Sequence, residues 1–189
     1  MRESRMPPLA AADMTGAQRK AADEMAAGPR KGVKGPFIPL LRSPELMDRL
    51  QKVGEYLRFQ SSLEQRISEF IMLIVSREWT QQFEWFVHVP LGRKAGIAED
   101  TIVALAEGRR PAAMSEAEAV AYDFCEELLR TRGVCDTTYR RAVAAFGERG
   151  VIDVLGVAGY FTAVSMVMNV AHTPPSVDES VNALLPYPF

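Results

Sequence analysis

The stretch of residues 66–96 constrains the fold most, because it is the most apolar and most aromatic part of the 189-residue chain. Apolar side chains cover most of the surface of a helix predicted over residues 63–78, a pattern typical of a central buried helix. A second helix is predicted over residues 80–94 and is closed by Gly96, a residue type favoured just after a helix. We therefore expect the rest of the chain to pack around this pair of helices.

Residues that start and stop helices divide the remaining sequence into further helical segments. Ser43 and Pro44 form one start, and Ser115 with Glu118 three residues later forms a capping box. No segment alternates polar and apolar residues with the period of a strand. The sequence thus predicts an all-α, single-domain multi-helix bundle, with helices over 15–27, 43–59, 63–78, 80–94, 98–107, 115–131, 136–146 and 150–171.

The ends of the chain carry less regular patterns. Residues 1–14 mix proline, alanine and charge with no period, so we expect a loose arm. Residues 29–42 are expected to lack regular structure, because Pro36 and Pro39 remove backbone donors. The apolar side chains of that segment favour packing across a groove or a subunit interface. The apolar C-terminal tail is likewise expected to dock on the body or on a partner.

Composition excludes several classes of function. Hydrophobic residues make up 48% of the chain and charged residues 24%, and the net charge of −2 gives no reason to expect nucleic acid or an anionic membrane as partner. No secretory leader or membrane span is expected, because the N-terminus shows no apolar h-region and no uninterrupted apolar run approaches the roughly 20 residues that span a bilayer. Cys125 and Cys135 are too few and too far apart for a disulfide framework. A reduced, cytoplasmic setting is expected.

Glu69, Glu84 and His88 bring acidic groups and a histidine together inside a hydrophobic helical pattern. Glu84 and His88 are four residues apart, so they contact each other on one helix face. A carboxylate beside an imidazole raises the imidazole pKa and fixes its tautomer, which suits proton transfer near neutral pH. Glu69 could fold back towards His88, and Arg66 could pair with Glu69. An ordinary helix pair and a surface ion pair explain the same spacings, so both interpretations stay open.

The ordered set of motifs in this region resembles the carboxymuconolactone decarboxylase family, which includes the alkylhydroperoxidase D-like proteins. The matching residues are Glu69, then Phe83-Glu84-Trp85-Phe86-Val87-His88, then Ala95-Gly96, with Gly35-Pro36-Phe37 and Pro39 before them and Gly159-Tyr160 and Asn169 after them. The resemblance implies an alkylhydroperoxidase D-like helical domain over residues 35–175. It leaves an N-terminal arm with a short helix over 1–34 and a tail over 176–189.

The chain departs from the peroxidase branch of that family. Glu84 and Gln81 stand at the two positions where that branch has cysteines. A thiol peroxidase needs one thiolate to attack the peroxide and a second thiol to resolve the product. This departure argues against hydroperoxide reduction and leaves the decarboxylase-like branch.

The resemblance implies a cofactor-independent lyase that decarboxylates a small carboxylated lactone or a related unsaturated acid. His88 is the predicted proton donor, Glu84 its orienting partner and Glu69 a second acid or base. Aromatic side chains are predicted as pocket walls, Gln81 lies one turn before Glu84, and other polar side chains are predicted to hold the substrate carboxylate. The substrate-binding candidates are Trp79, Gln81, Trp85, Tyr160, Arg58, Arg77 and Asn169. Aromatic residues at such spacing are also typical of a core.

No cofactor or metal is expected. The chain has two histidines, and it lacks both the His-Glu-x-x-His signature and a glycine-rich phosphate loop after a strand. Family members are usually trimers or hexamers, so the resemblance also implies a homo-oligomer. Two alternatives remain open: an isomerase, dehydratase or hydrolase that uses the same acid–base residues, and a non-catalytic helical oligomer or ligand-binding protein.

Overall fold

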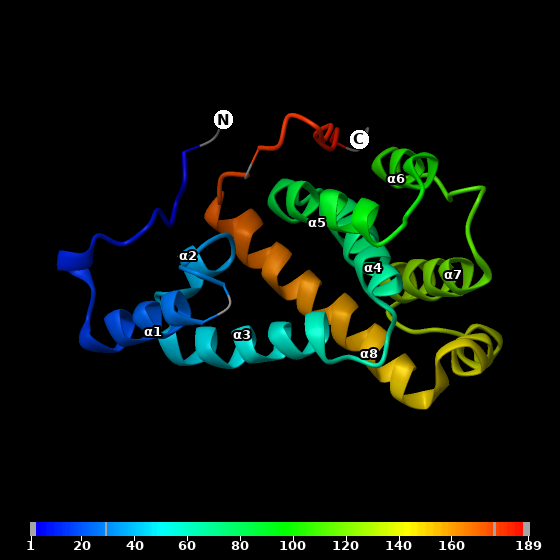
Figure 1. The fold of residues 1–189 in the computed structure, drawn as a ribbon, viewed down its shortest axis with the longest axis horizontal. Helices are drawn as coiled ribbons and strands as arrows, with labels where there is room; N and C mark the ends of the chain where they lie inside the picture. The colour runs from blue at the N-terminus through cyan, green and yellow to red at the C-terminus, as the bar shows by residue number, and fades with distance from the viewer. Residues whose placement is uncertain (1–2, 29, 176, 187–189) are drawn as a thin grey trace.

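The computed structural model describes residues 3–28, 30–175 and 177–186, and its regular structure there is helical throughout. A 3-10 turn at Ala11–Asp13 precedes eight α-helices (Figure 1). They are α1 Gly16–Ala27, α2 Phe37–Leu40, α3 Pro44–Phe59, α4 Gln65–Glu78, α5 Gln82–Lys94, α6 Glu99–Ala106, α7 Glu116–Thr131 and α8 Asp136–Ala171. The all-α prediction is confirmed.

Helix α4 lies at the centre of the fold. Every residue over 67–77 is buried, and α4 packs against α5, α7 and α8, with α6 and α3 contributing fewer contacts (Figure 1). A helix that is apolar almost all round must be covered on all sides. The core cluster accordingly joins the side chains of α4 to those of α5, α7 and α8. The central position expected for this segment is confirmed.

Helix α8 combines the last two predicted helices. Its backbone leaves helical geometry at Gly147, where φ is 69° and ψ is 170°, a conformation that glycine adopts without steric cost. By length and composition α8 is also apolar enough to cross a membrane, although no uninterrupted apolar run in it is that long. More than half of its most apolar window is buried inside the protein, as in the core helix of a helical bundle.

The segment before α3 is more regular than predicted. Residues Phe37–Leu40 form the short helix α2, so the expectation of no regular structure over 29–42 is wrong there. Pro36 is the N-cap, and Pro39 lies in the first turn, where a missing N–H breaks no helical hydrogen bond. Phe37 and Leu40 are buried in a second, smaller core cluster with residues of α1 and α3.

The N-terminal arm also contacts the body at the end of α8. The backbone N–H of Arg5 donates to the carbonyl of Ala171 at 2.8 Å. Arg42 donates to the carbonyl of Pro7 at 2.8 Å. These two hydrogen bonds attach the arm to the body, and the arm also contains the 3-10 turn at Ala11–Asp13.

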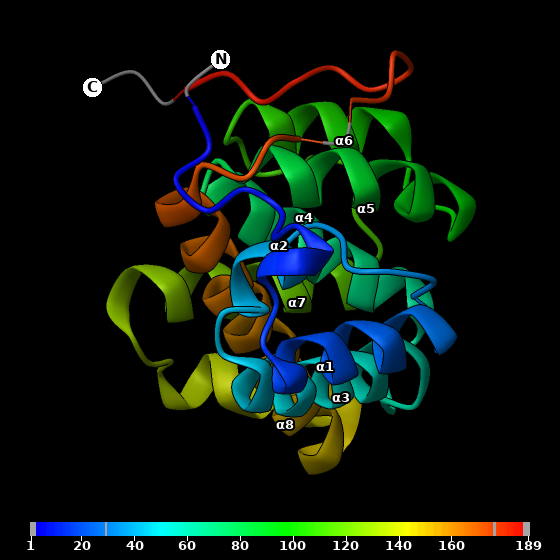
Figure 2. The same cartoon turned by 90° about the vertical axis from the view of Figure 1, so that its left-hand side faces the viewer.

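The C-terminal tail lies along α5 and is held by side chains that bind its backbone (Figure 2). Four donors bind four tail carbonyls: Arg77 to Leu185 at 2.7 Å, Gln82 to Leu184 at 2.6 Å, Trp85 to Asn182 at 3.0 Å and Arg93 to Ser180 at 3.0 Å. Gln82 also accepts from the backbone N–H of Leu184 at 3.0 Å. Paired backbone groups allow an irregular segment to stay close to a core.

Two neighbouring leucines test this docking. Leu184 is 3% exposed and Leu185 is 75% exposed. Leu184→Ala is expected to lower the free energy of unfolding by about 2 kcal/mol, because it removes a buried side chain and leaves a gap. Leu185→Ala, the same change on the solvent side, is expected to stay within about 0.5 kcal/mol. Urea denaturation measures both, and equal effects would show that the tail does not dock as described.

Candidate active site

Helices α4 and α5 hold a buried histidine between two carboxylates. His88 Nδ1 lies 2.7 Å from Glu69 Oε2, and His88 Nε2 lies 3.2 Å from Glu84 Oε2. All three side chains are at least nine-tenths buried. The Glu84 contact follows from the four-residue spacing on α5. The Glu69 contact, suggested by the sequence as a possibility, arises because α4 packs directly against α5.

Further contacts fix the imidazole ring. Gln65 Nε2 donates to Glu69 Oε1 at 2.7 Å, which holds the carboxylate on the far side of the ring. The ring of Phe161 meets the His88 ring edge-on, with centroids 5.0 Å apart and planes at 82°. Packing and hydrogen bonding on several sides leave the ring little freedom to turn, which is what positioned proton transfer requires.

The geometry favours a protonated ring. A neutral imidazole has one N–H and can donate to one carboxylate, whereas the imidazolium donates to both. Burial disfavours the charged ring, but hydrogen bonds to Glu69 and Glu84 outweigh it and raise the pKa of His88 to about 9. At neutral pH His88 therefore carries a proton that it can give away.

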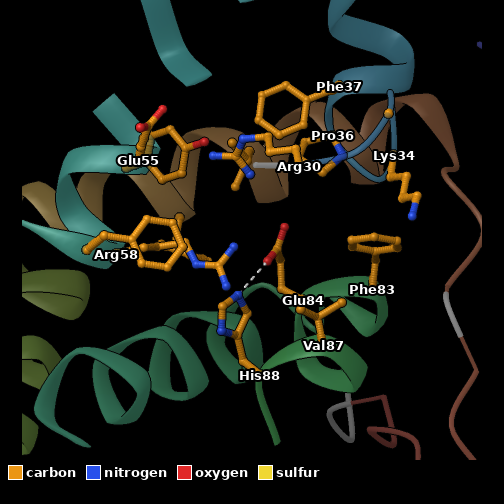
Figure 3. Close-up of a pocket in the computed structure, with 15 residues that line it drawn as sticks. Arg30, Lys34, Pro36, Phe37, Glu55, Arg58, Phe83, Glu84, Val87 and His88 are labelled. Carbon is orange, nitrogen blue, oxygen red and sulfur yellow. Dashed lines mark ion pairs between the residues drawn. The ribbon is translucent and has the colours of Figure 1, made fainter. Parts of the chain in front are cut away.

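A cavity of about 350 Å³ opens beside His88 and Glu84 (Figure 3). His88 and Glu84 line it from α5, and Figure 3 shows the carboxyl of Glu84 turned towards the open space. Glu69 lies behind the ring and is not among the lining residues. Apolar and charged side chains share the remaining wall. The other lining residues are Arg30, Gly32, Lys34, Pro36, Phe37, Glu55, Arg58, Phe59, Phe83, Val87, Tyr160, Phe161 and Val164.

Two of the predicted substrate-binding residues lie in this cavity. Arg58 reaches it from α3 and Tyr160 from α8. Burial raises the pKa of Tyr160 to about 12, so its hydroxyl keeps its proton at neutral pH and can donate a hydrogen bond. Gly54 makes room for that hydroxyl, since a Cβ there would lie 2.4 Å from the Tyr160 oxygen.

The other predicted substrate-binding residues do not line the His88 cavity. Trp85 and Arg77 line a second cavity of about 640 Å³ beside the C-terminal tail. Although Trp85 follows Glu84 in the chain, successive helix residues point about 100° apart. Trp79, Gln81 and Asn169 meet at the end of α8: Gln81 donates to Asn169 at 2.7 Å, and Asn169 donates to the carbonyl of Trp79 at 2.9 Å.

The expected Arg66–Glu69 pair does not form. Arg66 binds Glu118 of α7 through two hydrogen bonds of 2.9 Å each. Glu118 is completely buried and also completes the capping box of α7 with Ser115. A buried carboxylate needs a partner more than an exposed one does, which explains why Arg66 turns towards α7.

Sequence reasoning missed most of the cavity wall. Arg30, Lys34 and Phe37 come from the segment expected to pack across a groove or a subunit interface, and their side chains line the cavity. Phe83 was expected beside the Glu84–His88 pair and lines the cavity, and Val87, one turn after it on α5, could have been identified from that spacing. No local pattern marks Arg30 or Glu55, because tertiary packing alone brings them to His88.

Neither cysteine lies in the cavity wall. Cys125 is buried in α7, and burial raises the pKa of its thiol to about 12. Cys135 is exposed at the start of α8. Within the described part of the chain, no group of three His, Cys, Asp or Glu side chains is arranged to hold a metal ion.

Comparison with known proteins identifies the fold. The sequence matches no protein-family model, and no curated protein is significantly similar to it. An uncharacterized peroxidase-related protein from Ralstonia eutropha JMP134, described as an alkylhydroperoxidase AhpD core, superposes with a TM-score of 0.73 at 14% identity, over 92% of each chain. A protein of unknown function from Agrobacterium tumefaciens, suggested to be the antioxidant defence protein AhpD, gives 0.63 at 19% identity, over 74% of this chain and 96% of that one. The chain therefore has the AhpD-like fold, as the resemblance implied.

Proposed function

We propose that the protein is a cofactor-independent lyase that decarboxylates a small carboxylated lactone or a related unsaturated acid. One observation carries the proposal: the buried ring of His88 lies between the carboxyl groups of Glu69 and Glu84, and His88 and Glu84 line a cavity. The AhpD-like fold includes enzymes. The cavity of about 350 Å³ lies at the small end of ligand pockets, which suits a small molecule.

The proposed chemistry needs a proton donor and little else from the protein. The bond between the substrate carboxyl carbon and its neighbour breaks, carbon dioxide leaves, and the electron pair stays on the conjugated substrate as a dienolate. His88 passes its proton through the Glu84 carboxyl to the dienolate carbon, and solvent then returns a proton to His88. The apolar wall keeps bulk water away from the carbanion-like intermediate, and the cations around the cavity stabilise its negative charge.

Glu69 has a positioning role in this proposal. Its carboxylate touches His88 Nδ1 and is held by Gln65, but it does not line the cavity. It therefore keeps the ring protonated and correctly turned, whereas the sequence suggested that it acts as a second acid or base. Such an orienting carboxylate behind a catalytic histidine works through the ring rather than on the substrate.

The alternative functions differ in whether they use the His88–Glu84 site for catalysis. An isomerase, dehydratase or hydrolase would use the same His88 and Glu84, and product analysis separates these reactions from decarboxylation. A purely structural oligomer would have no need of a cavity beside a buried histidine, whereas a ligand-binding protein would use the same cavity and bind its ligand without turnover. A thiol peroxidase would need cysteines in the cavity wall, where Glu84 stands instead.

We also propose that the chain forms a homo-oligomer, a trimer or hexamer. Large apolar side chains are exposed on α3 and on α8, among them Leu46, Val53, Phe59, Ile152 and Val170. Exposed apolar surface of this kind is often covered in an assembly. Phe59 also lines the cavity, so an interface on α3 would lie near its mouth.

The purified protein is expected to release carbon dioxide from at least one member of a panel of unsaturated lactone carboxylates and acyclic unsaturated acids. In deuterated water the product should gain a deuteron at the carbon that the proposed dienolate protonates. The variant Cys125→Ala/Cys135→Ala is expected to keep this activity, because neither thiol lies in the cavity wall. Mass spectrometry and carbon dioxide detection measure both, and turnover without loss of carbon dioxide would assign the site to an isomerase, dehydratase or hydrolase.

A further inference from the structure

Two guanidinium groups face the same cavity from different parts of the chain. Arg58 comes from α3, and Arg30 comes from the segment between α1 and α2. Figure 3 shows the Arg58 guanidinium directed towards Glu84 and His88, with Arg30 on the side of Phe37. We infer that Arg30 and Arg58 together form an anion site that binds the carboxylate of the ligand and positions it beside Glu84 and His88.

One nitrogen of the Arg58 guanidinium lacks a hydrogen-bond partner in the part of the chain that the structure describes. Its Nε is buried and has no hydrogen-bond partner within the described residues. Its guanidinium carbon lies 5.1 Å from the centre of the Phe59 ring, an arrangement that helps to hold the plane of the group. A buried guanidinium nitrogen without a partner is costly, and a carboxylate in the cavity would relieve that cost.

Arg30 is held in place by the Phe37 ring, the backbone of Gln51 and a hydrogen bond with the Tyr160 hydroxyl, contacts that engage only part of its five N–H donors. Its guanidinium carbon lies 4.5 Å from the centre of the Phe37 ring, and Nη2 donates a long hydrogen bond of 3.4 Å to the carbonyl of Gln51. Burial lowers the pKa of Arg30, and the nearby charge of Arg58 acts in the same direction. Two like charges so placed favour an anion between them.

Gly54 allows the Arg30 guanidinium and the Tyr160 hydroxyl to lie close to the backbone of α3. A Cβ at Gly54 would lie 2.4 Å from the Tyr160 oxygen and 3.0 Å from Arg30 Nη2. A glycine at this point of α3 therefore lets the hydroxyl and the guanidinium approach the helix backbone together. The protonated Tyr160 hydroxyl adds a neutral donor to the two cations.

The balance of charge around the cavity limits the ligand. The cations are Arg30, Lys34, Arg58 and protonated His88, and the carboxylates are Glu55, Glu84 and, behind the ring, Glu69. One positive charge is left over, which a single carboxylate neutralises. Guanidinium groups bind planar carboxylates with two parallel hydrogen bonds, which fixes orientation as well as charge. The inferred ligand is thus a small, largely apolar molecule with a carboxylate at one end.

Isothermal titration calorimetry with two probes tests the site. Coumalate is a carboxylated unsaturated lactone, and methyl coumalate is its uncharged ester. Wild type is expected to bind coumalate at least tenfold more tightly than the ester. Arg58→Gln and Arg30→Gln should each weaken coumalate binding by about tenfold or more and leave the ester unaffected. Arg49→Gln, a change of the same kind at an exposed position of α3, should match wild type.

Lysine variants separate lost recognition from lost folding. Arg58→Lys and Arg30→Lys keep the positive charge but lose the planar guanidinium that can form two parallel hydrogen bonds with a carboxylate. We therefore expect thermal melts like those of wild type and intermediate affinities for coumalate. Equal binding of acid and ester, undetectable binding of coumalate to wild type, or full affinity in both glutamine variants would each contradict the anion site.

This inference concerns the same site as the proposed function but can fail separately. The proposed function predicts that His88→Gln loses carbon dioxide release, whereas the anion site predicts that the glutamine variants of Arg30 and Arg58 lose coumalate affinity. If coumalate binds through both arginines and no substrate loses carbon dioxide, the decarboxylase proposal fails and the anion site stands. If carbon dioxide is released and the arginine variants bind coumalate normally, the anion site fails and the decarboxylase proposal stands.

Discussion

Replacing His88 by glutamine is expected to reduce carbon dioxide release by about 10²–10⁴-fold, the range typical of losing a general acid. Glutamine is polar and close in size, so it can still hydrogen-bond to Glu69 or Glu84. It has no proton to give near neutral pH, whereas His88 has a pKa raised to about 9. Steady-state rates of carbon dioxide release on the best substrate of the panel measure the loss.

His172 provides the matched control. It lies just after the end of α8, where its Nδ1 is 3.2 Å from the carbonyl of Glu3, and it does not line the cavity. His172→Gln makes the same chemical change and is expected to keep the wild-type rate. Circular dichroism should show unchanged helicity in both variants. Full activity of His88→Gln would remove His88 from the proposed mechanism.

The helices could be predicted because their signals are local. The capping box of Ser115 and Glu118 predicts the start of α7, and both of its hydrogen bonds are present in the structure. Gly147 predicts a break, and the chain bends there within α8. Failure came at α2, where two prolines suggested irregular structure although both occupy positions that a helix tolerates.

The acid–base centre was predictable in part. Spacing alone puts Glu84 beside His88, since both lie on one face of a helix. The contact of Glu69 with His88 depends on how α4 packs on α5, which spacing cannot determine. Arg66 shows that spacing along the chain cannot predict such partners. Its partner Glu118 is 52 residues away and reaches it only through the packing of α7 on α4.

The cavity was the least predictable part. Trp85 looked like a wall because it adjoins Glu84 in the sequence, yet it points to the other side of α5 and bonds to Asn182 of the tail. Arg30 carried no helical or motif signal, yet it lines the cavity. Cavities form where distant segments fail to fill space, and a pattern within one segment does not report that.

Glu69→Gln is expected to change how stability depends on pH. Glu69 accepts a hydrogen bond from His88, and its charge helps to hold the pKa of His88 at about 9, above the value of about 6.5 for a free imidazole. A raised folded-state pKa stabilises the protein fully below about pH 6.5, and this stabilisation disappears as the pH rises through about 9. A shift of this size corresponds to on the order of 3 kcal/mol.

The variant should therefore lose more stability near pH 6 than near pH 9, since an uncharged amide cannot stabilise the imidazolium as the carboxylate does. Urea denaturation at both pH values measures the difference, and an NMR titration of the His88 ring should show its pKa moving down. Glu118→Gln is the control, because it removes a buried carboxylate bound to Arg66 and leaves His88 untouched. It should destabilise the protein by similar amounts at both pH values. If Glu69→Gln behaved like Glu118→Gln and the His88 titration did not move, Glu69 would not be what keeps the ring protonated.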